Sequence, residues 1–128
     1  MANARDAKKL KRLVLAQTMA ESMAKSQVGA LSSELVVLEE KLNNAREAFT
    51  NSQTSNLFSD MHLKHINSLT TACEKLRRKL ETARQELHSE TARNKKLQGR
   101  LKDKLIHLER EEEQRLLLER LDRTANGR

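Results

Sequence analysis

The histidines are the residues of this sequence that could bind a metal ion. His62 and His65 are three residues apart, so on a helix they would lie one turn apart. A structural zinc site needs about four ligands and a catalytic one about three. His88 and His107 lie far along the chain, and no cysteine or carboxylate cluster completes the set. We predict no metal site and interpret the histidines as solvated helix-surface side chains.

The single cysteine, Cys73, is the one candidate for thiol chemistry. It falls between Leu69 and Leu76 in an apolar pattern, so we expect a buried core filler rather than a nucleophile. One cysteine excludes an intrachain disulfide and fits a reducing compartment. Three scattered glycines cannot build a phosphate-binding loop. The two paired helices that we predict below would also offer no cleft for carboxylates that act as acid and base. We predict no catalytic residue, no cofactor and no enzymatic activity.

Anion binding is the chemistry that the sequence favours, because the formal net charge is +7 and the cations are concentrated. Such a balance indicates an acidic partner: a protein surface, a nucleic acid or an anionic lipid. Neither phenylalanine, Phe49 or Phe58, lies near the cations to stack on bases, so nucleic acid is disfavoured. The candidate partner-binding cations are Arg5, Lys8, Lys9, Lys11 and Arg12 in one segment, and Arg93, Lys95, Lys96, Arg100, Lys102 and Lys104 in another.

The elements that must position these cations are long helices with a repeat of seven. The chain has no proline, and Ala, Glu, Lys, Leu and Arg make up more than half of it, which is typical of coiled coils. Apolar residues alternate at spacings of three and four, so we predict a left-handed coiled coil. The first seam is Leu10, Val14, Gln17, Glu21, Ala24, Val28, Leu31, Leu35, Leu38, Leu42, Ala45 and Phe49. The second is Ile66, Leu69, Cys73, Leu76, Leu80, Ala83, Leu87, Glu90, Asn94, Leu97, Leu101, Lys104 and Leu108.

One break separates the two seams, at the Ser-, Thr- and Asn-rich segment 50–59. These side chains compete for backbone hydrogen bonds, and Ser59 or Asp60 could cap a following helix. A connection of about ten residues lets the second helix fold back along the first. We predict an all-α, antiparallel coiled-coil hairpin forming a single unit over 1–128: a helix over about 4–49, a bend at 50–59, a helix over about 60–123 and a tail at 124–128.

The expected register follows from this bend, and in it the numbers of facing residues add to roughly 110. It places residues 5–12 beside residues 93–104, and the polar seam residues Gln17 and Glu21 opposite Glu90 and Asn94. It also leaves the end of the second helix overhanging, without an intrachain partner from about residue 101. We predict an apolar partner-binding stripe there, formed by Leu105, Leu108, Leu117, Leu118 and Leu121.

Membrane and targeting signals are weak. No apolar run approaches the roughly 18–20 residues that cross a bilayer, and the basic start has no apolar segment typical of a secretory signal. Residues 2–28 loosely resemble a mitochondrial transit peptide, but the heptads run through them and Asp6 and Glu21 interrupt their positive charge. We expect a cytoplasmic protein.

The whole chain resembles the family of the flagellar export protein FliJ and its type III secretion counterparts. The likeness lies in the length, the absence of proline, the basic start, the bend, and a longer second helix with the terminal segment 109–120. It implies an antiparallel stalk that docks its termini-bearing end on a hexameric export ATPase. It also implies contacts with export-gate proteins and substrate chaperones, and peripheral association with the inner face of the cell membrane through these partners.

The predicted function is therefore that of a non-enzymatic adaptor or stalk in flagellar or type III protein export. A structural coiled-coil subunit, either a dimer or a hetero-oligomeric scaffold or tether, is the alternative from another class. A basic coiled coil associated with nucleic acid is the second alternative. A parallel dimer of one continuous helix fits segment 50–59 poorly, because its residue types disfavour helix interiors.

Overall fold

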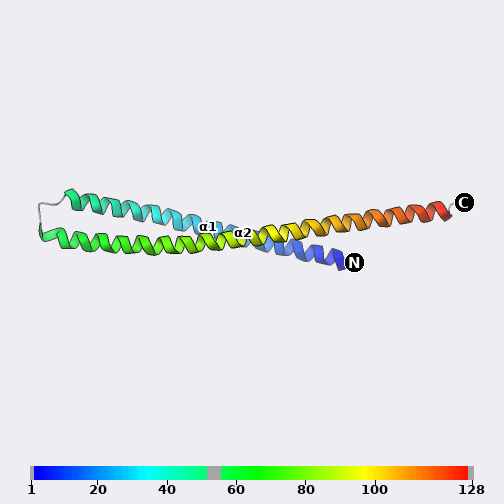
Figure 1. The fold of residues 1–128 in the computed structure, drawn as a ribbon, viewed down its shortest axis with the longest axis horizontal. Coiled ribbons are helices and arrows are strands. Elements are labelled where there is room, and N and C mark those ends of the chain that lie inside the picture. Colours follow the sequence, from blue (N-terminus) through cyan, green and yellow to red (C-terminus); the bar gives the residue numbers. More distant parts are fainter. Residues whose placement is uncertain (1, 52–55, 127–128) are drawn as a thin grey trace. The chain divides into compact units, whose positions relative to one another are not determined.

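The computed structural model consists of two long helices, α1 over Ala2–Asn51 and α2 over Asn56–Asn126 (Figure 1). The structure describes residues 2–51 and 56–126, with side chains for 4–51 and 59–126, and these ranges contain no strand. The two helices pack against each other. The predicted all-α helical hairpin is confirmed.

The chain divides into two compact units, and each pairs a segment of α1 with a segment of α2. The central unit comprises Ser22–Ser89. In it the ring centroids of Phe49 and His62 are 6.2 Å apart, and Arg77 Nη2 lies 3.1 Å from Glu39 Oε1. Residue numbers therefore rise along one segment as they fall along the other, so the pairing is antiparallel.

The terminal unit comprises Met1–Glu21 with Glu90–Arg128. Here Gln17 Nε2 donates a hydrogen bond to the Glu90 carbonyl oxygen at 3.1 Å, and Lys104 Nζ lies 3.6 Å from Asp6 Oδ2. This unit is antiparallel too. The contacts in both units agree with the predicted register, in which facing numbers add to roughly 110.

The seam between the helices is formed by the residues that the heptad pattern selects. All positions of both predicted seams are buried or half-buried, whereas most of the residues between them are exposed. Burial is deepest in the central unit, where Cys73 is fully buried and Leu42, Leu80 and Ala83 are each 4% exposed. The core is a single narrow layer, as expected for two helices that share only one face.

Both helices are longer than the sequence pattern indicates. α2 begins at Asn56, so the predicted cap at Ser59 or Asp60 is wrong, and it continues through Thr124 to Asn126. Polar residues cost a helix only tenths of a kcal/mol each, and extending an existing helix is easier than starting one. Thr50 also bonds its hydroxyl to the Arg46 carbonyl oxygen at 2.9 Å, one turn back. Of the predicted bend and tail, residues 52–55 and 127–128 lie outside the described residues.

Candidate partner-binding surface

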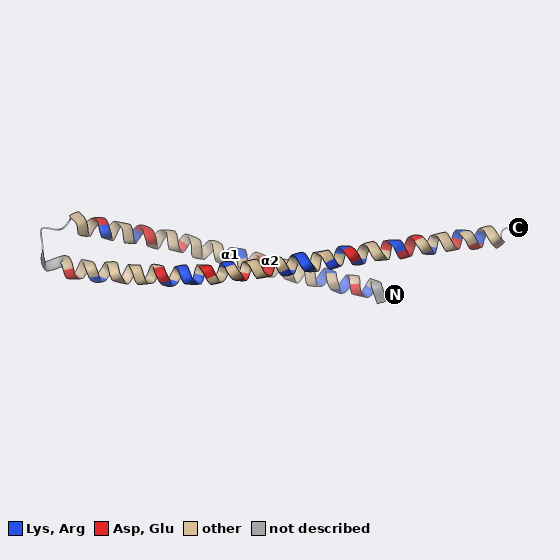
Figure 2. Cartoon of the chain, in the orientation of Figure 1, with Lys and Arg blue, Asp and Glu red and all other residues tan. Residues whose placement is uncertain are grey.

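The eleven predicted cations meet in the terminal unit, on the first turns of α1 and on the segment of α2 that pairs with them (Figure 2). We call this set the basic cluster. It consists of Arg5, Lys8, Lys9, Lys11 and Arg12 of α1, with Arg93, Lys95, Lys96, Arg100, Lys102 and Lys104 of α2. All of these residues are exposed except Lys104, which is half-buried.

Few of these charges are neutralised by other residues that the structure describes. Lys104 pairs with Asp6, and Arg93 Nη1 lies 3.4 Å from Glu90 Oε1. Among the residues that the structure describes, the other nine cations take part in no ion pair. The segments 5–12 and 93–104 contain only two carboxylates, Asp6 and Asp103, so their net charge is +9.

This charge works against folding. Like charges on two paired helices repel each other, and Arg5 lies in the first turn of α1, where a cation is unfavourable to the helix dipole. The first turn of α1 holds no acidic residue that would offset it. The basic cluster therefore needs an explanation other than stability of the hairpin.

Beside the basic cluster, polar side chains replace apolar ones in the seam and bond across it. Asn94 is 6% exposed, and its Nδ2 donates to Glu21 Oε2 at 2.7 Å. The Thr91 hydroxyl donates to Glu21 Oε1 at 3.3 Å, and Gln17 Nε2 donates to the carboxylate as well as the carbonyl of Glu90. The predicted meeting of Gln17 and Glu21 with Glu90 and Asn94 is thus confirmed. We call Gln17, Glu21, Glu90, Thr91 and Asn94 the polar layer.

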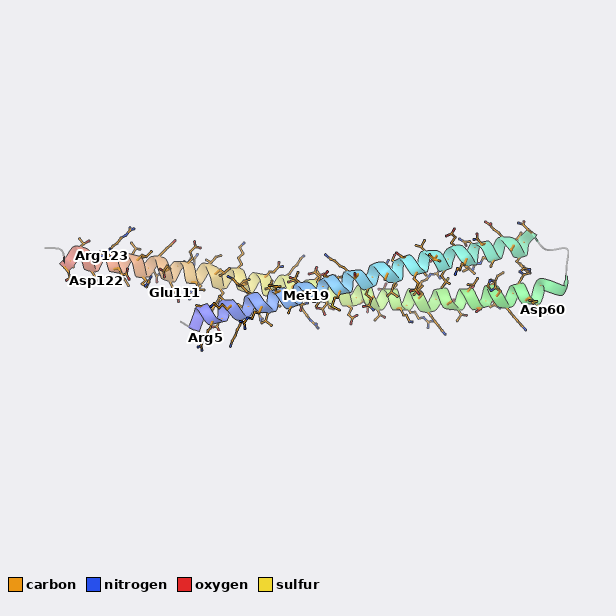
Figure 3. The ribbon with its side chains drawn as sticks, turned by 180° about the vertical axis from the view of Figure 1, so that it is seen from behind. Arg5, Met19, Asp60, Glu111, Asp122 and Arg123 are labelled. Atoms are coloured by element: carbon orange, nitrogen blue, oxygen red, sulfur yellow. The ribbon has the colours of Figure 1, made fainter. Side chains whose placement is uncertain are left out.

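Beyond the polar layer and the basic cluster, α2 continues past the end of α1. Residues 109–126 are all exposed, and Leu117, Leu118 and Leu121 are 58%, 63% and 65% exposed. We call 109–126 the overhang. Figure 3 shows its side chains, among them Asp122 and Arg123, projecting from a stretch of α2 that has no helix beside it.

The overhang starts later than predicted. Leu108 is half-buried, so this residue of the predicted stripe belongs to the paired region, whereas Leu105 is exposed, at 41%. In a register where facing numbers add to roughly 110, the start of α1 at Ala2 lies opposite about residue 108, and Asp6 reaches Lys104. Leu117, Leu118 and Leu121 are the most exposed residues of the predicted stripe.

Charges within the overhang pair along the helix. Arg115 Nη2 lies 2.6 Å from Glu112 Oε1, and Arg115 Nη1 lies 3.8 Å from Glu119 Oε1. Just before the overhang, His107 Nε2 lies 3.0 Å from Glu111 Oε1. The hydrogen bond to Glu112, with the charges of Glu112 and Glu119, raises the pKa of Arg115. These pairs support a helix that lacks packing partners, since such i,i+3 and i,i+4 contacts stabilise isolated helices.

Sequence reasoning missed several exposed apolar side chains of the terminal unit, because they lie off the heptad seam. Ile106 is 38% exposed and, with Leu101 and Leu105, lines a shallow open groove on α2 between Gln98 and Glu109. Leu116 is 45% exposed in the overhang. On α1, Leu13, Leu15 and Met19 are 52%, 65% and 62% exposed. The sequence signal that could have identified these residues is a large apolar side chain at a heptad position outside the seam.

The other candidate chemistry falls in the central unit. Cys73 lies in the core as a free thiol, and His62 is half-buried against Phe49 while His65 is exposed. Within residues 2–51 and 56–126, no three His, Cys, Asp or Glu side chains are grouped so that they could hold a metal ion. A second open groove, lined by Leu31, Thr82 and Ala83 among others, also contains Arg78, Lys79 and Glu86, and its Thr82 hydroxyl donates to the Arg78 carbonyl oxygen at 3.0 Å.

Neither α1 nor α2, over the stretches that the structure describes, has a segment that is both long and apolar enough to cross a membrane. Comparison of this chain with models of protein families, with curated proteins and with solved structures finds no match.

Proposed function

We propose that this protein is a non-enzymatic coiled-coil adaptor of a protein-export machine, and that the basic cluster docks on an acidic surface of a hexameric export ATPase. The observation that carries the proposal is the gathering, on two chain segments, of nine exposed cations that form no ion pair among the described residues and whose like charges repel. Charge that costs stability and remains exposed is expected where it steers a partner of opposite sign.

The overhang supplies a second contact in this proposal. Leu117, Leu118 and Leu121 are exposed within little more than one turn of helix, and burying each would contribute about 1.5–3 kcal/mol. Cations would accelerate the encounter and set its orientation, while these leucines would hold the complex together. The resemblance of the chain to the FliJ family favours an export ATPase as the partner, with export-gate proteins and chaperones as further contacts. The adaptor would then work in the cytoplasm, at the inner face of the cell membrane.

Capture from an extract of the source cell, followed by mass spectrometry, tests the proposal. The wild-type chain is expected to retain the export ATPase, and K8E/K9E/K96E/R100E is expected to lose it while keeping its helical circular dichroism. The matched control is K41E/K64E/K75E/K79E, which reverses four exposed lysines of the central unit. Added salt should weaken capture, because it screens exposed charges.

Equal capture by the two quadruple variants would refute docking through the basic cluster. Capture of a coiled-coil scaffold component by both variants, with no ATPase among the retained proteins, would instead favour the structural subunit.

A further inference from the structure

The outward side of α1 in the terminal unit combines exposed cations with exposed apolar side chains. We call it the outer face of α1. It consists of Arg5, Lys8, Lys9, Arg12, Leu15 and Met19. All six residues are exposed, and Leu15 and Met19 are 65% and 62% exposed. Figure 3 labels Arg5 and Met19, which mark the two ends of this face.

The outer face points away from α2. The seam residues Ala7, Leu10, Val14 and Gln17, which face α2, are buried or half-buried and alternate with the outer-face residues along the helix. At about 100° per residue, the six outer-face side chains occupy an arc of about 120°. The face is therefore broad, with its cations in the first turns and its two large apolar side chains in the turns that follow.

Three classes of acidic ligand can be compared against this arrangement. A nucleic acid would engage the cations but leave Leu15 and Met19 in water, and the face has no aromatic side chain for base stacking. A partner helix contacts a narrow stripe, so it would leave part of a 120° arc uncovered. The surface of an anionic bilayer engages both kinds of side chain: phosphates bind Lys and Arg, and the interface accepts large apolar side chains such as leucine.

We propose that the outer face of α1 binds the surface of an anionic membrane. Arg5, Lys8, Lys9 and Arg12 contact lipid phosphates, and none of them takes part in an ion pair among the described residues that would have to break first. Leu15 and Met19 enter the interface between headgroups and acyl chains. The proposal does not depend on the export function. In this proposal the chain contacts lipid directly, whereas in the proposed export function it reaches the membrane only through its protein partners.

Sedimentation of the purified full chain with vesicles tests the proposal without any protein partner. The chain is expected to bind mixed phosphatidylglycerol and phosphatidylcholine vesicles, and not phosphatidylcholine alone, with affinity that falls as salt is added. Each cation near such a surface contributes about a fivefold factor in binding, so K8E/K9E/R12E, which removes three cations and adds three carboxylates, should bind at least about a hundredfold more weakly. K75E/R78E/K79E makes the same charge change in the central unit and should bind at least tenfold better than K8E/K9E/R12E.

The apolar part of the face has its own variant and control. L15S/M19S should bind several-fold more weakly and lose the binding that remains at high salt. V36S/V37S replaces two exposed valines of the central unit, 61% and 52% exposed, and should bind as the wild type does.

Four results would overturn the proposal: no binding to anionic vesicles, equal loss in the two triple variants, wild-type binding by L15S/M19S, or equal binding to phosphatidylcholine alone. Binding of a duplex oligonucleotide by a chain that ignores vesicles would assign the cations to nucleic acid instead. Circular dichroism of every variant shows whether its helices are intact. A failure here would leave capture of the ATPase unaffected, because that experiment contains no vesicles.

Discussion

Asn94 is a polar residue buried in the seam, and its hydrogen bond bears on how the two helices align. Its amide donates to the Glu21 carboxylate at 2.7 Å across the seam, where an apolar pair would pack more simply. Polar residues in a coiled-coil seam lower stability but favour one alignment of the helices over its neighbours. The polar layer therefore explains why α1 and α2 pair in this register, which places the two basic segments side by side.

Replacing Asn94 by alanine should destabilise the hairpin by about 1–2 kcal/mol, because the Glu21 carboxylate loses a donor inside the seam. Urea denaturation followed by circular dichroism measures the change. The double variant E21L/N94L is the companion: it should be at least as stable as the wild type, since an apolar pair removes the cost of burying polar groups. An N94A chain as stable as the wild type would show that the hydrogen bond contributes nothing.

At the scale of the elements, seven-residue periodicity was sufficient to predict the seam. Every position from Leu10 to Phe49 and from Ile66 to Leu108 that the pattern selects is at least half-buried. Periodicity works here because two helices share one face, and burial then depends only on position around the helix. Helix ends were predicted less well, since residues such as Ser59 tolerate either a cap or an interior position at a small difference in free energy.

The candidate surface was predicted only in part, for a related reason. The polar layer and the meeting of the basic segments follow from the register that the position of the bend predicts. Exposed apolar residues off the seam, such as Leu15 and Ile106, carry no periodic signal, because nothing in the chain itself packs against them. These residues are recognised only once the structure shows which faces of each helix are left exposed by the pairing.

Two glycines inside the helices provide a test of element stability. A Cβ atom at Gly29 or Gly99 would meet no neighbouring atom within 4 Å. Alanine at either position should therefore stabilise the hairpin by about 0.5–1 kcal/mol, because it reduces the freedom of the unfolded chain without a clash. Thermal melts of G29A and G99A measure this. A lowered melting temperature would indicate that these positions need the smaller residue.

Unequal packing along α2 should appear as unequal amide protection. Residues 109–126 have exposed side chains, whereas Leu76 and Leu80 are buried against α1. Helices without tertiary packing open readily, so we expect amides beyond Leu108 to exchange with deuterium far faster than those near Leu76. Addition of the partner should protect the overhang. Equal protection in the free monomer would mean that the overhang packs on another part of the chain.

At the scale of the whole molecule, charge is the dominant feature. The net charge is +7, while the segments of the basic cluster alone carry +9. Screening should reduce repulsion within the terminal unit, so the melting temperature of the free chain should rise as salt is added at low ionic strength. A calorimetric series in sodium chloride measures it. A melting temperature that falls with salt would show that favourable ion pairs outweigh the repulsion of the basic cluster.

Convergence of the two basic segments in one antiparallel monomer is the central claim, and a disulfide tests it most directly. Gln17 and Glu90 are in hydrogen-bond contact, so the variant Q17C/E90C, with Cys73→Ala to remove the native thiol, places two cysteines across the seam. The pair Q17C/E113C is the control, because 113 lies in the overhang, beyond the reach of residue 17 in this register.

We predict that mild oxidation closes an intrachain disulfide in Q17C/E90C and not in Q17C/E113C. The product should sediment as a single chain of 14.7 kDa. Disulfide-linked dimers from Q17C/E90C, with no intrachain product, would contradict the hairpin and with it the joint basic cluster.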